Sequence, residues 1–139
     1  MDTAIASCGC PATLHIPLPP GAQAARHARR TVAGLLALDS ASCPSVVAED
    51  LVLIVSELVT NAVLHAKGPY ALTVGLEDGR AGVAVSDGSP DLAEYHGDGN
   101  HRQQPETGGR GLKIVRELGA DLFVSRSGIG KQVIAVLTW

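Results

Sequence analysis

Aromatic residues are scarce in this 139-residue chain, which contains one phenylalanine, two tyrosines and one tryptophan. Proteins that bind single-stranded nucleic acid stack bases on aromatic side chains, so this class of protein is largely excluded. Charge of one sign is not in excess either, since the formal net charge is −3. This balance gives no electrostatic reason to expect nucleic acid or an anionic membrane surface as a partner.

Long apolar runs and a targeting segment are also missing from the sequence. No stretch approaches the roughly 20 apolar residues that a membrane span needs. The N-terminal residues MDTAIASCGC have neither the basic segment nor the apolar run of a signal peptide. We therefore expect a cytoplasmic protein with no membrane partner. We also expect a flexible leader over residues 1–11 and a single domain over residues 12–139.

Cysteine is rare as well, with Cys8, Cys10 and Cys43 the only three. A Cys-x-Cys pair together with Cys43 and His15 could in principle bind zinc. The spacing matches none of the usual zinc-finger patterns, however. We therefore interpret the three thiols as structurally incidental.

What the sequence does contain is a series of well-separated helical and strand patterns. Apolar residues at spacings of three and four predict helices over residues 21–38, 49–66 and 109–118. Alternating patterns predict strands over residues 12–16, 70–77, 80–87, 121–126 and 132–138. The pair Asp78-Gly79 is typical of a hairpin turn. Together the elements predict an α+β fold in two layers, with helices on one face of a mostly antiparallel sheet.

The other elements are expected to pack around the helix over residues 49–66. Glu49 and Asp50 are expected in its first turns, where the helix dipole favours negative charge. Three polar residues of this helix are spaced four apart and form a row on one side: Glu57, Asn61 and His65. Such a row can simply be the solvent-exposed face of the helix. Two glycine-containing turns further along the chain favour a functional site instead.

The first of these turns follows the strand over residues 80–87. Asp87 has the parity of the apolar residues of that strand, so its carboxylate is expected on the covered side of the sheet, where it needs a donor. The second turn, Gly109-Arg110-Gly111-Leu112, comes after a long polar segment that we expect to be a lid, over about residues 91–108. It opens a helix, whose free amide groups and dipole favour an anion.

The order of these motifs resembles the GHKL superfamily of ATP-binding domains, which have the Bergerat fold. The motifs are E-x-x-x-N-A-x-x-H-A over residues 57–66, Asp87-Gly88 after a strand, a long loop, and Gly-Arg-Gly-Leu over residues 109–112. Within that superfamily the chain resembles the stand-alone anti-sigma-factor serine/threonine kinases of actinobacteria. The resemblance covers approximately residues 26–137.

The resemblance implies a role for each matching residue. Glu57 would activate or orient the attacking hydroxyl or water, and Asn61 would bind the Mg²⁺ ion that bridges the ATP phosphates. Asp87 would accept a hydrogen bond from the adenine amino group, with Gly88 in the same turn. His65 would have a phosphate-binding or packing role. The phosphate-binding turn would consist of four consecutive residues: Gly109, Arg110, Gly111 and Leu112.

The implied function is an ATP- and Mg²⁺-dependent serine/threonine protein kinase in transcription control. Such a protein binds a sigma factor and phosphorylates an anti-sigma-factor antagonist, and it does not contact nucleic acid directly. The resemblance leaves open a homodimer. The alternative is a catalytically weak, nucleotide-responsive protein-binding module, whose function Glu57→Ala would leave intact. The chain departs from the usual pattern at Gly88, which stands one position early in the adenine-binding turn, and at Gln132, which occupies the neighbourhood of a threonine common near the adenine.

Overall fold

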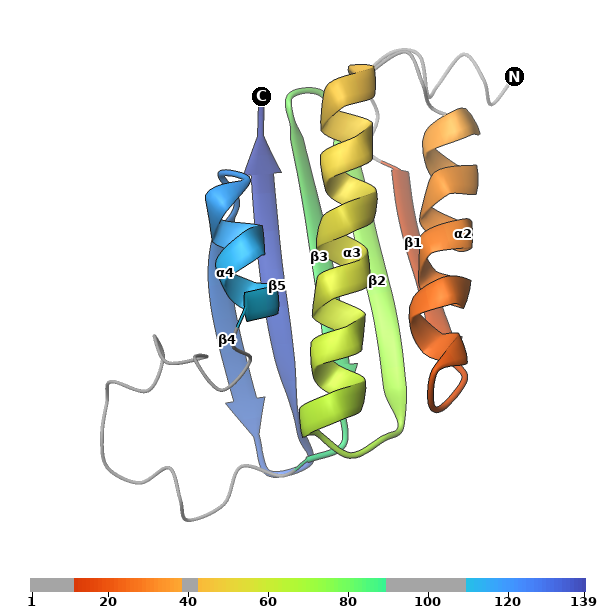
Figure 1. Ribbon diagram of the computed structural model, residues 1–139, viewed down its shortest axis with the longest axis vertical. Coiled ribbons are helices and arrows are strands. Elements are labelled where there is room, and N and C mark those ends of the chain that lie inside the picture. Colours follow the sequence, from red (N-terminus) through yellow and green to blue (C-terminus); the bar gives the residue numbers. More distant parts are fainter. Residues whose placement is uncertain (1–11, 39–42, 90–109) are drawn as a thin grey trace.

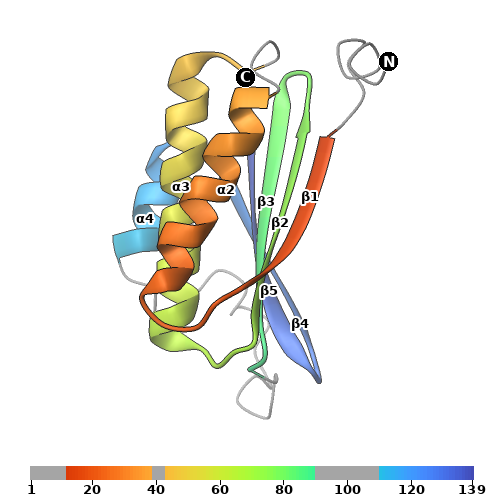
Figure 2. The same cartoon turned by 90° about the vertical axis from the view of Figure 1, so that its right-hand side faces the viewer.

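The structure is a computed structural model that describes residues 12–38, 43–89 and 110–139. Within these ranges three helices cover one face of a five-stranded sheet (Figures 1 and 2). The helices are α2 (Gln23–Leu38), α3 (Ser45–His65) and α4 (Arg110–Glu117). The strands are β1 (Ala12–Leu18), β2 (Tyr70–Glu77), β3 (Arg80–Asp87), β4 (Asp121–Ser127) and β5 (Gly130–Thr138). The predicted two-layer α+β fold is confirmed.

The sheet has the strand order β1-β2-β3-β5-β4, and every neighbouring pair is antiparallel. Two tight hairpins, β2–β3 and β4–β5, account for four of the strands. The β2–β3 turn contains Gly79 at a φ of 82°, a backbone conformation that glycine adopts without steric cost. Strand β3 therefore lies in the middle of the sheet, with its last residue, Asp87, at the end where α3 also finishes (Figure 1).

The core lies between α3 and the central strands and is built from aliphatic side chains. Ile54, Val55 and Val59 of α3 are almost completely buried, as are Val83 and Val85 of β3. Burial of each such side chain contributes about 1.5–3 kcal/mol relative to exposure. Among the described residues, none of the buried core side chains is aromatic. Helix α3 is thus fixed against β3, which sets the position of its polar residues.

Helix α3 begins at Ser45, four residues before the predicted start. Pro44 precedes it with a φ of −59°, and a proline is tolerated there because the first turn of a helix does not need its N–H. Glu49 and Asp50 consequently lie outside the first turn, which contains no acidic residue. The expectation that these two residues interact with the helix dipole is therefore wrong.

Strand β1 is longer than predicted and continues through Pro17 to Leu18. It is an edge strand that pairs only with β2, and proline is tolerated on edge strands because one side of the backbone has no strand to bond to. The β4–β5 turn is shorter than predicted, because β5 starts at Gly130. The expected leader and lid lie outside the described residues. No helix in the described part of the chain is long and apolar enough to cross a membrane.

Candidate functional site

The polar row of α3 is partly covered by neighbouring elements. Glu57 and Asn61 are half-buried, whereas His65 is exposed in the last turn of the helix. The side-chain oxygen of Asn61, Oδ1, is buried and has no hydrogen-bond partner among the described residues. A buried acceptor without a donor costs about 1–3 kcal/mol, so native proteins rarely keep one without a function. The interpretation of this row as a solvated face does not fit Asn61.

The first turn of α4 packs directly against this row. A β-carbon added at Gly111 would lie 3.0 Å from Oε1 of Glu57, which is tighter than ordinary van der Waals contact. Leu112 and Val115 are buried in the core and hold α4 in this position. Glycine at position 111 therefore lets the N-terminal turn of α4 approach the Glu57 carboxylate closely.

Asp87 is the one charged residue buried in the described part of the chain, with 6% of its surface exposed. Its side chain lies on the helix-covered face of the sheet, as its parity predicts. Oδ1 accepts a hydrogen bond of 2.8 Å from the backbone N–H of Ser89. Oδ2 lies 3.4 Å from Nζ of Lys131. These two donors supply the partners that the sequence analysis requires for a buried carboxylate.

Two reciprocal hydrogen bonds tie the turn after β3 to the turn after α3. The N–H of Gly88 donates to the Lys67 carbonyl at 2.8 Å, and the N–H of Lys67 donates to Oγ of Ser89 at 2.8 Å. A β-carbon added at Gly88 would lie 2.5 Å from the Gly68 carbonyl oxygen. The early position of this glycine thus has a structural cause, since the backbone of the preceding turn lies directly against residue 88.

Most of the predicted site residues lie on the C-terminal half of α3 and on two elements that contact this helix, β3 and the start of α4. Figure 1 shows these elements side by side. Glu57 and Gly111 are in contact, and Asp87 ends the strand beneath the C-terminal half of α3. His65 is exposed, and its predicted role remains a prediction. Gly109 lies outside the described residues, and Arg110 is the first residue of α4.

Lys131 has no predicted role in the site, whereas Gln132 is predicted in the neighbourhood of the adenine. The pairing of β3 with β5 sets Lys131 opposite Asp87 and Gln132 opposite Ser86. Gln132 and Ser86 therefore share the uncovered face of the sheet. Both line a hollow together with Asp87 and Lys131, and the position of Gln132 near the adenine remains a prediction. Residue parity in β5 identifies Lys131, because Val133, Ala135 and Leu137 pair with the core residues of β3 on the same face.

The residues of this site fit Mg²⁺ rather than zinc. Magnesium prefers oxygen ligands, keeps several waters and needs few protein groups. The buried and unpartnered Oδ1 of Asn61 is a ligand of this kind. The described residues contain no cluster of three or more histidine, cysteine or acidic side chains suited to a metal. Cys43 is buried, and Cys8 and Cys10 lie outside the described residues.

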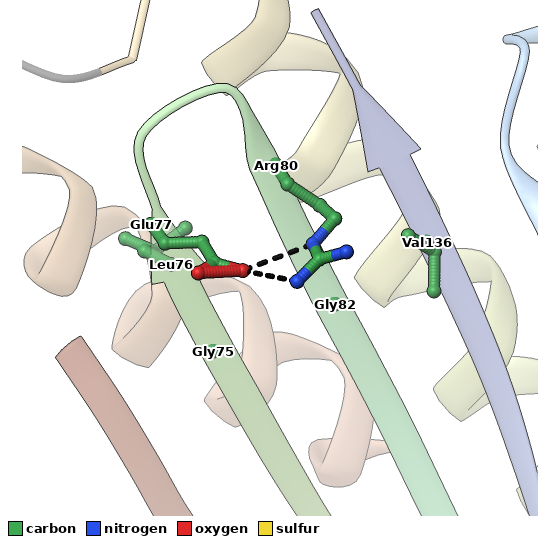
Figure 3. A pocket seen from close by; sticks show the side chains of 6 residues that line it. All are labelled: Gly75, Leu76, Glu77, Arg80, Gly82 and Val136. Carbon is green, nitrogen blue, oxygen red and sulfur yellow. Dashed lines mark hydrogen bonds and ion pairs between the residues drawn. The ribbon is translucent and has the colours of Figure 1, made fainter. Parts of the chain in front are cut away.

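A separate hollow of about 340 Å³ lies on the uncovered face of the sheet. Gly75, Gly82 and Val136 line it, and Arg80 Nε donates to Glu77 Oε2 at 2.9 Å beside it (Figure 3). It contains none of the predicted site residues. Its position at the opposite end of β3 from Asp87 separates it from the site described above.

Comparisons with known proteins identify the family of the chain. The model of the histidine kinase-like ATPase domain family matches residues 18–137. Among solved structures the chain is similar to the histidine kinase domain from the Erythrobacter litoralis EL346 blue-light activated histidine kinase. The two share 29% identity with a TM-score of 0.47, over 65% of this chain and 46% of that chain. The chain thus spans less than half of that protein's length, and no curated protein matches it. The chain belongs to the histidine kinase-like ATPase domain family, within the ATP-binding GHKL superfamily.

Proposed function

We propose that this chain binds ATP with Mg²⁺ and transfers the γ-phosphoryl group to a serine or threonine hydroxyl of a partner protein. The observation that carries the proposal is the buried, unpartnered Oδ1 of Asn61, one helical turn from the Glu57 carboxylate. A metal ligand and a general base on one helix face suit phosphoryl transfer, in which positioning and charge neutralisation do most of the work. Membership of an ATP-binding family supports the choice of nucleotide.

Each residue has a defined task in this proposal. Glu57 takes the proton from the attacking serine or threonine hydroxyl. At the same time the hydroxyl oxygen bonds to the γ-phosphorus, and the bond between this phosphorus and the bridging oxygen of the ADP leaving group breaks. The free backbone N–H groups at the start of α4, around Gly111 and Leu112, donate to the phosphate oxygens. Asn61 would hold Mg²⁺, which when bound neutralises charge on the phosphates. Asp87 accepts a hydrogen bond from the adenine amino group.

The proposed partners follow from the resemblance to anti-sigma-factor kinases. In this proposal the chain binds a sigma factor, and the hydroxyl that it phosphorylates belongs to an anti-sigma-factor antagonist. Phosphorylation adds about −1.5 to −2 charges and changes which partner is bound. A cytoplasmic location is part of the same proposal, and the resemblance leaves open a homodimer.

Calorimetric titration with ATP, with and without Mg²⁺, tests the nucleotide site. We expect Mg²⁺-dependent binding to the natural chain, and a loss of at least tenfold in affinity in Asn61→Ala and Asp87→Asn. Arg80→Met, which breaks the surface ion pair at the other end of β3, is the matched control and should bind normally. No binding to the natural chain at millimolar ATP would overturn the proposal.

Phosphotransfer is tested separately, with candidate antagonist proteins and labelled ATP. Glu57→Gln keeps the size and the helix but removes the base, so we expect unchanged Mg²⁺-ATP binding with at least a hundredfold slower transfer. If ATP changes the binding of the partner protein, but Glu57→Gln changes neither that binding nor phosphotransfer, the chain is the nucleotide-responsive binding module instead.

A further inference from the structure

The ion pair at the base of the site involves a lysine for which the proposed function has no task. Lys131 opens β5 on the helix-covered face, opposite Asp87, and its side chain is only 20% exposed. A lysine ammonium is strongly hydrated, and its burial is costly unless other groups replace the water. Here it faces a carboxylate whose side chain is 1% exposed. The ammonium is therefore held inside the site rather than in solvent.

Lys131 and Asp87 together present a donor beside an acceptor. The distance of 3.4 Å between Nζ and Oδ2 is longer than a tight charged hydrogen bond, so neither group is saturated by the other. An ammonium has three N–H donors, and a carboxylate has about four acceptor positions. Asp87 uses one of these positions for Ser89. Both groups have capacity left for a ligand.

Adenine carries the complementary pair of groups. Its 6-amino group is a donor, and a ring nitrogen that accepts hydrogen bonds lies on each side of it, N1 on one edge and N7 on the other. An acceptor and a donor held side by side can form two hydrogen bonds with this edge of adenine, one with the amino group and one with the neighbouring ring nitrogen. If Asp87 accepts from the 6-amino group, a donor 3.4 Å from its carboxylate oxygen lies beside the neighbouring ring nitrogen.

We propose that Lys131 is a specificity-determining residue of the nucleotide site, which donates a hydrogen bond to the purine ring nitrogen next to the 6-amino group. The inference rests on the proposed ATP site and adds a second contact to the base. Gly130 supports it, because a β-carbon there would collide with the Asp87 carbonyl oxygen. Glycine at this position allows the start of β5 to lie close enough to Asp87 for the two side chains to act together.

A competing role for Lys131 gives the opposite result. If Lys131 only neutralises the charge of Asp87, adenine must displace the lysine in order to bind. Removal of the ammonium would then increase the affinity for ATP. If Lys131 donates a hydrogen bond to the purine ring, adenine binds Lys131 and Asp87 together. Removal of the ammonium then weakens ATP binding. The sign of the change in affinity therefore separates the two roles.

The experiment measures ATP, 1-deaza-ATP and 7-deaza-ATP binding to the natural chain and to Lys131→Met. Each analogue replaces one of the two ring nitrogens with a C–H group. We expect one analogue to bind the natural chain about tenfold more weakly than ATP, because a hydrogen bond to a charged group is lost. In Lys131→Met, ATP should bind about tenfold more weakly than to the natural chain, and that analogue should bind as well as ATP. Arg80→Met, the matched loss of a cation from an ion pair, should behave as the natural chain.

The analogue measurement on the natural chain keeps the inference testable even if Lys131→Met fails to fold. Equal binding of ATP and both analogues would overturn the inference while leaving the ATP site intact. Tighter ATP binding by Lys131→Met would overturn it as well. No ATP binding by the natural chain would instead reject the proposed function, and the inference with it.

Discussion

At the scale of single residues, Asn61 combines a cost in stability with a proposed gain in binding. Its buried Oδ1 has no donor among the described residues, and asparagine is a weaker helix former than alanine. Both properties lower the stability of the free chain. A cation that binds this oxygen would offset the cost, which is the usual relation between stability and function at a binding site.

Asn61→Ala should therefore leave the free chain at least as stable as the natural one. The variant removes an unsatisfied buried acceptor and improves helix propensity, and it loses no hydrogen bond to another described residue. We expect the free energy of unfolding to be unchanged or raised by about 1 kcal/mol. Urea unfolding without nucleotide measures it. Thr60→Ala, an exposed neighbour in α3, is the control and should keep Mg²⁺-ATP binding. A loss of 2 kcal/mol or more in Asn61→Ala would mean that Asn61 has a structural role.

At the scale of elements, the end of β3 and the turn after α3 behave as one unit. The hydrogen bonds between Lys67 and the Gly88-Ser89 turn join two loops that are distant in sequence. Oη of Tyr70 also donates to the Ala66 carbonyl at 2.7 Å, which fixes the end of α3. The position of Asp87 relative to α3 depends on these contacts.

Gly88→Ala should disrupt this unit. The added β-carbon would lie 2.5 Å from the Gly68 carbonyl oxygen and 3.0 Å from Cδ of Pro69, and backbone atoms cannot move away cheaply. We expect a loss of about 1–3 kcal/mol in the free energy of unfolding, measured with urea. Gly82→Ala, within β3, has open space around the new carbon and should change stability by less than about 0.5 kcal/mol. Similar effects of the two substitutions would contradict the close contact at Gly88.

The elements that the sequence predicts best are those with local signals. The β2–β3 hairpin has alternating apolar residues on both sides of Asp78-Gly79, and its bounds agree with the prediction. The predicted start of α3 is four residues late because the sequence before it is rich in serine, which is typical of a linker. The predicted strand over residues 12–16 ends before Pro17, and only strand order shows that β1 is an edge where proline is tolerated.

The same difference separates the predictable from the unpredictable parts of the candidate site. Glu57 and Asn61 are on one helix, so their spacing alone places them on one side of it. The pairing of Lys131 with Asp87 depends on the register between β3 and β5, which are separated in the chain by a long segment, a helix and strand β4. The contact of Gly111 with Glu57 likewise depends on how α4 packs, which no local pattern encodes.

At the scale of the whole molecule, the candidate site and the only tryptophan lie at opposite ends of the sheet. Trp139 follows β5 and is partly buried against the core. Its backbone N–H donates to the Gly79 carbonyl in the β2–β3 turn at 2.9 Å. Asp87 lies at the other end of β3 (Figure 1). One aliphatic core under α3 connects the two ends, so the chain should unfold as a single cooperative unit.

Mg²⁺-ATP should therefore stabilise Trp139 as much as it stabilises the site itself. A ligand present at a hundred times its dissociation constant adds about 2.7 kcal/mol to the free energy of unfolding. For a domain of this size that corresponds to a rise of roughly 10 °C in Tm. Scanning calorimetry and tryptophan fluorescence should give the same Tm with and without ligand, because both follow one transition. At the same ligand concentration Asn61→Ala, with at least tenfold weaker binding, should show at most about half of this rise by either method. A rise seen by calorimetry but not at Trp139 would mean that the two ends unfold separately, and that the ligand stabilises only the end of the sheet where it binds.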